Sequence, residues 1–335
     1  MIRSLRVLLC IAVLATCALA QTTLNGAGAT FPYPIYSKWF NEYHNLHSNI
    51  QINYQSIGSG GGIRQVQAGT VDFGASDGPM GDEQIAQSKV KVLHVPTVLG
   101  AVVPAYNIPG VNGEVKFTPD VLADIYLGKI TKWNDGRITK VNPGVNFPDQ
   151  NITVVHRSDG SGTTYIFTDY LSSVSPAWAS KVGKGVAVQW PTGLGANGNV
   201  GVAQQVKDSP GGIGYVELTY AKQNHMAYAD LKNAAGHYVA PTLESMSAAV
   251  STASIPDDFR FSMVNAPRAT AYPIAGASWL ILFQKQADAT RGRKLVEFIR
   301  WAVTDGQKLS SKLDYGPLPE ELVQRILKQA DQVSY

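Results

Sequence analysis

Short runs typical of β-strands alternate with segments of helical periodicity along this chain, and this alternation most constrains its fold. Strands are predicted at 50–54, 71–73, 98–106, 152–156, 212–216 and 278–283. Helices are predicted at 32–43, 294–303 and 320–328. In the first helix Ile35, Trp39 and Tyr43 share one face, and Thr30 is a candidate N-cap. The alternation predicts an α/β architecture with mainly parallel sheets.

The first twenty residues have the pattern of an export signal. Two arginines precede an apolar run at 7–15, and Ala-Leu-Ala at 18–20 supplies small residues before a cleavage site. We therefore expect residues 1–20 to be a signal peptide, cleaved near Ala20/Gln21. The apolar run is shorter than the roughly 20 residues that span a bilayer, which argues against a membrane anchor.

Both cysteines of the chain, Cys10 and Cys17, lie within this leader. The mature chain is therefore expected to contain neither a disulfide nor a thiol nucleophile. Cys17 follows Leu-Ala-Thr, which is weakly similar to a lipoprotein processing site, but threonine is a poor residue just before such a cysteine. A soluble exported protein is the favoured interpretation, and a lipoprotein is not expected.

Length and charge narrow the class of protein further. About 315 residues follow the leader, more than one hydrophobic core usually organises, so two domains are expected. Without Arg3 and Arg6, 26 basic residues face 25 acidic ones, and the basic residues are scattered along the chain. A nucleic-acid binder would carry a concentrated basic surface, so no nucleic-acid partner is predicted.

Three stretches place Ser, Thr or Gly at a turn that is predicted to open a helix, at 26–32, 56–62 and 157–163. The start of a helix leaves backbone N–H groups unpaired and carries the positive end of the helix dipole. If the three turns meet, they form an anion-binding site. A site shared between early and central residues would lie between two domains, with the chain crossing at 97–106 and returning at 278–283.

The third turn carries the strongest candidate for anion recognition. The guanidinium of Arg157 matches two oxygens of a tetrahedral anion, and Asp159 could hold it in place. Ser161 and Thr163 add hydroxyl donors, and Gly162 allows close approach of the backbone. The alternative interpretation is an ordinary capping loop with an Arg–Asp pair at the surface.

The second turn contains Ser59 within the glycine-rich stretch 58–63. It is not a nucleotide P-loop, because no Gly-Lys-Ser/Thr closes it, and it lacks the acidic residue of a dinucleotide fingerprint. Exposed N–H groups at these glycines could bind an anion, whereas the alternative is a flexible turn.

Asp77 is an acid among these donors and should repel an anion, unless the anion carries a proton that a carboxylate can accept. Phosphate carries such a proton near neutral pH and sulfate does not, so Asp77 could discriminate between them. The alternative is an Asx-turn acid at the start of a loop.

The same segment, 74–78, also fits the G-x-S-x-G pattern of serine hydrolases around Ser76. A hydrolase elbow needs a helix directly after its serine, and Gly78-Pro79 disfavours one. A secreted phosphatase or serine hydrolase is therefore the weaker alternative. No histidine shows metal-ligand spacing, and neither a catalytic residue nor a metal site is predicted.

Five segments taken together resemble the periplasmic phosphate-binding proteins of bacterial phosphate ABC transporters, and the likeness covers essentially the whole mature chain. They are Gly-Ala-Gly-Ala-Thr-Phe-Pro at 26–32, Val-Asp-Phe-Gly-Ala-Ser-Asp at 71–77, Asp-Ile-Tyr-Leu-Gly-Lys-Ile at 124–130, Arg-Ser-Asp-Gly-Ser-Gly-Thr at 157–163 and Gly-Ile-Gly-Tyr-Val-Glu at 212–217. Gly60 departs from the pattern, since the family often has a second serine there.

The resemblance implies a phosphate site in which every member is a hydrogen-bond partner. Its members are Thr30, Phe31, Ser59, Asp77, Arg157, Ser161, Gly162 and Thr163. Asp77 would accept the phosphate proton, and Asp159 would be the partner of Arg157.

The implied fold is the two-domain α/β periplasmic binding protein fold, type II-like, with mixed, mainly parallel sheets joined by hinge strands. Domain I would comprise 21–98 and 272–335, and domain II 99–271, with the phosphate cleft between them.

The resemblance implies high-affinity binding of inorganic phosphate in the periplasm without catalysis or a cofactor. Hinge closure around a dehydrated phosphate would present the protein, as a monomer, to an inner-membrane ABC permease with its ATPase. Sulfate, molybdate and arsenate remain alternative ligands.

Overall fold

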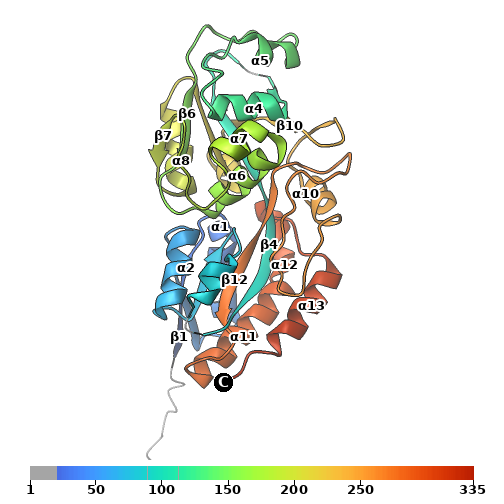
Figure 1. Cartoon of the computed structure of the whole chain (residues 1–335). Helices are drawn as coiled ribbons and strands as arrows, with labels where there is room; N and C mark the ends of the chain where they lie inside the picture. The colour runs from blue at the N-terminus through green and yellow to red at the C-terminus, as the bar shows by residue number, and fades with distance from the viewer. Residues whose placement is uncertain (1–20, 89, 112) are drawn as a thin grey trace, which may run out of the picture.

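Two adjacent strands, β4 (Val92–Asn107) and β12 (Ala275–Phe283), run between the two lobes of the molecule (Figure 1). The computed structural model describes residues 21–88, 90–111 and 113–335. The predicted signal peptide therefore lies outside the described residues. β4 pairs with β12 through its first half and with β8 (Gly212–Glu217) through its second half. Because β4 belongs to both halves of a nine-stranded sheet, it connects the lobes directly.

The remaining elements alternate along the chain as predicted. The other strands are β1 (Thr22–Gly28), β2 (Ile50–Ser56), β3 (Phe73–Ser76), β5 (Lys116–Phe117), β6 (Thr153–Arg157), β7 (Leu194–Ala196), β9 (Ala227–Tyr228), β10 (Asp230–Lys232) and β11 (Tyr238–Val239). The helices are α1 (Tyr33–Leu46), α2 (Ser59–Ala68), α3 (Asp82–Ala86), α4 (Pro119–Tyr126), α5 (Gly136–Val141), α6 (Gly162–Val174), α7 (Pro176–Lys181), α8 (Gly198–Asp208), α9 (Leu218–Gln223), α10 (Leu243–Val250), α11 (Ala289–Val303), α12 (Gln307–Ser310), the 3-10 helix η1 (Ser311–Leu313) and α13 (Glu320–Ala330). Among the described residues, no helix is both long and apolar enough to cross a membrane.

The large sheet has the order β2-β1-β3-β12-β4-β8-β6-β7, with β9 also on β4. Its outer strands pair in parallel, namely β1 with β2 and β3, and β6 with β7 and β8. All the antiparallel pairs of this sheet involve β4 or β12. The predicted mixed α/β fold is confirmed, and the parallel pairs lie on either side of β4 and β12.

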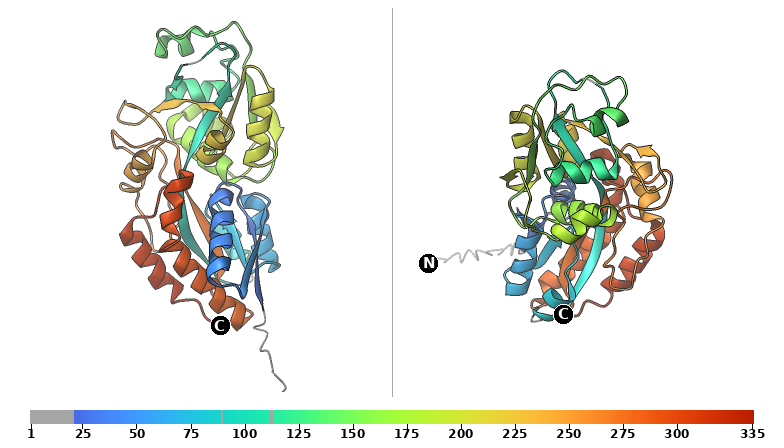
Figure 2. Two further views of the ribbon diagram at one scale, coloured as in Figure 1. Left: turned by 180° about the vertical axis from the view of Figure 1, so that it is seen from behind. Right: turned by 45° about the horizontal axis from the view of Figure 1, so that its top comes forward.

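In the first lobe, alternate residues of β3 face helices on opposite sides of the sheet. Phe73 packs against Phe40 of α1, which in turn contacts Phe298 of α11. Gly74 faces Val66 of α2 on the other side. Figure 2 shows the blue N-terminal and red C-terminal helices together in this lobe, apart from the green and yellow helices of the other. β3 is therefore covered by helices on both faces of the sheet, which suits a rigid support for a ligand site beyond its carboxyl end.

The apolar face predicted for α1 is confirmed, since Ile35, Trp39 and Tyr43 are all buried. The prediction of Thr30 as its N-cap is wrong. α1 begins at Tyr33 behind Pro32, and no side chain caps it by a hydrogen bond. The Thr30 hydroxyl cannot serve as the cap because it is bonded elsewhere, as described below.

The strand predicted at 71–73 lies two to three residues later, at β3. Asp72 lies just before the strand, where its side-chain Oδ2 accepts a hydrogen bond of 2.7 Å from the backbone N–H of Asn25. This shift places Ser76 at the end of β3 and Asp77 immediately beyond its carboxyl end.

Candidate anion-binding site

Hydrogen bonds join the three predicted helix-opening turns. α2 begins at Ser59 and α6 at Gly162, so two turns lie directly at helix starts. The backbone N–H of Gly60 donates to the carbonyl of Gly160 over 2.9 Å, which joins the second turn to the third. The first turn joins the third through Asn199, whose Nδ2 lies 2.8 Å from Thr30 Oγ1 and 3.1 Å from Thr163 Oγ1. The lobes therefore meet at these turns.

Arg157 ends β6 and is almost completely buried. Its Nε and Nη2 donate to the two carboxylate oxygens of Asp159 over 2.6 and 2.5 Å, and its Nη1 lies 3.3 Å from Thr163 Oγ1. Burial raises the pKa of Asp159, but the hydrogen bonds and charge of Arg157 outweigh this effect and hold the pKa below its usual value. A surface Arg–Asp pair is thus excluded, because the guanidinium lies inside the interface between the lobes.

Ser161 and Gly162 shape the start of α6. The Ser161 Oγ accepts a 3.0 Å hydrogen bond from the N–H of Thr164 and so acts as the N-cap. A Cβ on Gly162 would lie 2.5 Å from Asp77 Oδ2 and would also overlap the Ser59 hydroxyl. Only glycine fits here, because α6 closes directly onto residues of the other lobe.

Replacing Gly162 with alanine should therefore keep the lobes apart. We expect the ligand-free variant to fold with unchanged circular dichroism but to scatter X-rays as a more extended molecule, and to lose at least about tenfold in affinity for its anion. Gly81→Ala is the matched control, since a Cβ there has no atom within 4 Å. Equal scattering and affinity in both variants would contradict the role assigned to Gly162.

Asp77 is buried between strands and helix starts. Its Oδ1 accepts a 2.5 Å hydrogen bond from Ser278 of β12, and its Oδ2 lies 3.4 Å from Ser59 Oγ. Burial raises the pKa of Asp77 to about 7, although the hydrogen bond from Ser278 and the charge of Arg157 act in the opposite direction. A buried carboxyl that titrates near neutral pH can accept or donate a proton within the site.

Ser76 lacks the arrangement of a hydrolase nucleophile. No helix follows it directly, since α3 begins only at Asp82. Its hydroxyl donates to the carbonyl of Gly78, and the Nε2 of His94 accepts a hydrogen bond from the N–H of Met80. Both groups are engaged by nearby backbone, so the G-x-S-x-G match does not form a catalytic site.

The first turn is held by residues that sequence reasoning missed. The hydroxyl of Tyr220 donates to the carbonyl of Thr30, and that of Tyr315 donates to the carbonyl of Phe31, each over 2.6 Å. Neither residue carried a motif of its own, because both reach the turn from distant parts of the chain. The hydrogen bond from Tyr220 fixes the backbone of the turn across the interface between the lobes, whereas the one from Tyr315 fixes it within its own lobe.

Glu217, in the segment 212–217, is a buried acid beside this turn. Its Oε2 accepts from the N–H of Thr219 over 2.9 Å and lies 3.1 Å from the Tyr315 hydroxyl. Burial raises the pKa of Glu217 well above its ordinary value. The Tyr315 hydroxyl is therefore within hydrogen-bonding distance of both the Phe31 carbonyl and the buried carboxyl of Glu217.

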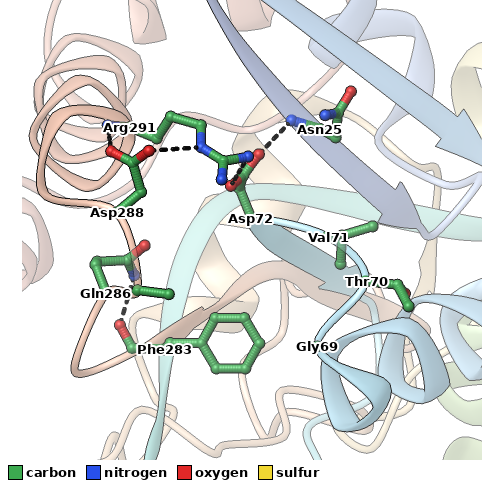
Figure 3. A pocket seen from close by; sticks show the side chains of 10 residues that line it. Asn25, Gly69, Thr70, Val71, Asp72, Phe283, Gln286, Asp288 and Arg291 are labelled. Atoms are coloured by element: carbon green, nitrogen blue, oxygen red, sulfur yellow. Dashed lines mark hydrogen bonds and ion pairs between the residues drawn. The ribbon is translucent and has the colours of Figure 1, made fainter.

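A separate pocket of about 140 Å³ lies at the amino end of β3, away from Asp77 (Figure 3). There Arg291 contacts both Asp72 and Asp288 over 3.3 Å. This pocket shares no residue with the candidate site. Across residues 21–88, 90–111 and 113–335, no group of three or more His, Cys, Asp or Glu side chains could hold a metal ion.

Comparisons with known proteins agree with this geometry. The model of the PBP superfamily domain matches residues 15–305. The crystal structure of a phosphate binding protein from Stenotrophomonas maltophilia superposes with a TM-score of 0.73 at 19% identity, covering 92% of this chain and 93% of that one. At that identity the superposition supports the fold alone, a two-domain periplasmic binding protein.

Two relatives are much closer in sequence, and both carry the name phosphate-binding protein PstS. The protein from Pasteurella multocida is 47% identical over 310 residues, covering 92% of this chain and 89% of its own length. The protein from Xylella fastidiosa strain 9a5c is 46% identical over 306 residues, covering 90% and 83%. The chain belongs to the PstS family of phosphate-binding proteins.

Proposed function

We propose that this protein binds inorganic phosphate between its lobes and delivers it to an ABC-type membrane permease, without catalysis. The observation that carries the proposal is a buried carboxyl, Asp77, set among a buried arginine, hydroxyls and two helix starts. Family membership supports the same function. The proposed phosphate ligands are Thr30, Phe31, Ser59, Asp77, Arg157, Ser161, Gly162 and Thr163.

Each proposed ligand has a chemical reason. Arg157 supplies a fixed positive charge, and charge-assisted hydrogen bonds contribute about 1.5 to 3 kcal/mol each. The starts of α2 and α6 supply backbone N–H groups and the positive ends of two helix dipoles. Four or five such bonds suffice for micromolar binding, about −8 kcal/mol, after the free-energy costs of closure.

Closure of the lobes follows from the same arrangement. We propose that domain I comprises 21–98 and 272–335 and that domain II comprises 99–271, with β4 and β12 as the hinge between them. A phosphate bound by both would favour the closed form and so present a distinct surface to the permease and its ATPase. We further propose that the protein acts as a monomer in the periplasm, exported by residues 1–20.

Calorimetric titration of dialysed protein with phosphate, sulfate and arsenate tests this function. At pH 8, phosphate should bind with at least micromolar affinity and sulfate at least about tenfold more weakly, because an ionised Asp77 accepts a proton from phosphate and repels sulfate. Equal affinities for phosphate and sulfate would overturn the role of Asp77. Absence of heat with all three anions would overturn the function, and tighter binding of arsenate would reassign the ligand.

A further inference from the structure

Asn199, the second residue of α8, lies between two hydroxyls of the proposed phosphate site. Its side chain is fully buried. Its Nδ2 is 2.8 Å from Thr30 Oγ1, in the first turn, and 3.1 Å from Thr163 Oγ1, in α6. One amide group therefore contacts a proposed ligand from each lobe.

The neighbouring backbone fixes which way this amide points. The N–H of Glu217 lies 2.9 Å from Asn199 Oδ1, and a backbone N–H can only donate. The carbonyl oxygen of the amide must therefore face Glu217, and the NH₂ group must face the two threonines. Its two hydrogens then supply one hydrogen bond to each hydroxyl oxygen.

Each of the two threonine hydroxyls also accepts a second hydrogen bond. Thr163 Oγ1 also accepts from Arg157 Nη1 over 3.3 Å, and Thr30 Oγ1 is also 3.4 Å from the backbone N–H of Asn199. Each hydroxyl oxygen thus accepts two hydrogen bonds, which uses both of its lone pairs. Among the described residues neither hydroxyl acts as a donor, so the proton of each is available to a further acceptor.

We propose that Asn199 is a positioning residue that commits the hydroxyls of Thr30 and Thr163 to donate to the bound anion. This proposal rests on the proposed phosphate-binding function. Without the amide, each hydroxyl could rotate and present a lone pair to the anion. With the amide present, each hydroxyl oxygen already accepts two hydrogen bonds. These bonds polarise the hydroxyl and so strengthen the hydrogen bond that it donates to the anion. The same amide makes closure and anion recognition depend on each other, because it reaches Thr30 only when the lobes meet.

A double-mutant cycle separates this role from a merely structural one. Phosphate affinity would be measured calorimetrically for the wild-type chain and Asn199→Ala, and again in a Thr30→Val/Thr163→Val background, with phosphate extended to millimolar concentration. Asn199→Ala should weaken binding by about tenfold in the wild-type background and by less than about twofold where the hydroxyls are absent. Equal losses in both backgrounds would overturn the proposal, as would an unchanged affinity of the single variant.

A second variant keeps the test decisive if Asn199→Ala fails to fold. Asn199→Asp has the same shape and still accepts from Glu217, but its carboxylate cannot donate to the threonines. It should bind phosphate at least about a hundredfold more weakly while unfolding cooperatively, and wild-type affinity would overturn the proposal. Val200→Ala is the control, since Val200 is the next residue of α8 and is exposed. A wild-type chain that binds no phosphate would instead refute the proposed function.

Discussion

Replacing Arg157 with alanine should weaken phosphate binding by about 2 kcal/mol or more, roughly a thirtyfold loss or greater. The guanidinium is buried and bonded to both oxygens of Asp159, so it is held in place before an anion arrives. Its removal would delete the charged partner of the phosphate oxygens. It would also leave the carboxylate of Asp159 uncompensated inside the site, where it repels the anion. Calorimetric titration at constant pH measures the loss.

Arg137 provides a matched control within the same chain. It also forms a two-pronged pair with the aspartate two positions away, Asp135, but its side chain is about half exposed. Arg137→Ala should leave phosphate binding within about twofold, since exposed ion pairs contribute little and this one lies outside the site. Arg157→Lys should recover part of the affinity, because lysine keeps the charge but not the planar fork. Similar affinities for the two alanine variants would remove Arg157 from the site.

Local sequence signals were enough to predict where the site residues lie on their elements. The stretches at Ser59 and Gly162 both open helices, as the spacing of small and apolar residues indicated. Pairing of Arg157 with Asp159 was also expected, since the aspartate lies only two positions after the arginine at the end of a strand. These features depend on residues that are close together in the sequence, so they can be predicted from composition and spacing.

Features set by distant residues could not be predicted in this way. Tyr220 and Tyr315 bind the carbonyls of the first turn from 190 and 284 residues away. Thr30 failed as an N-cap for the same reason, because its hydroxyl accepts from Asn199 of the other lobe rather than from α1. The propensity of a threonine to cap a nearby helix is overridden when its hydroxyl forms a hydrogen bond with a buried partner elsewhere in the fold.

The proposed hinge and the proposed phosphate site are connected by a short chain of buried hydrogen bonds. Ser278 of β12 donates to Asp77, and Thr97 of β4 donates to the carbonyl of Ser278 over 3.0 Å. Tyr36 of α1 shares a 2.7 Å hydrogen bond with Thr97. β4 and β12 therefore hold the one acid of the proposed site, which connects the charge state of Asp77 to the two strands proposed as the hinge.

The affinity for sulfate should depend on pH through Asp77. Its pKa is raised to about 7 by burial, so below that pH the carboxyl carries a proton and can donate to a sulfate oxygen. Above that pH it is ionised, accepts only, and repels sulfate. Sulfate itself does not titrate in this range, which makes it a cleaner probe than phosphate. Sulfate affinity should thus rise about tenfold from pH 8 to pH 6, the change expected when one proton is taken up with a pKa near 7.

Two variants at Asp77 show whether this group is responsible. Asp77→Asn cannot ionise, and its amide can donate at any pH, so its sulfate affinity should be high at pH 8 and flat down to pH 6. Asp77→Ala should also be flat and should narrow the gap between phosphate and sulfate at pH 8, because the repelling charge is gone. The measurement is calorimetry with millimolar sulfate at three pH values. A flat wild-type profile, or an unchanged phosphate-to-sulfate ratio in Asp77→Ala, would assign the discrimination to another residue, since Asp77 is the buried acid beside the starts of α2 and α6.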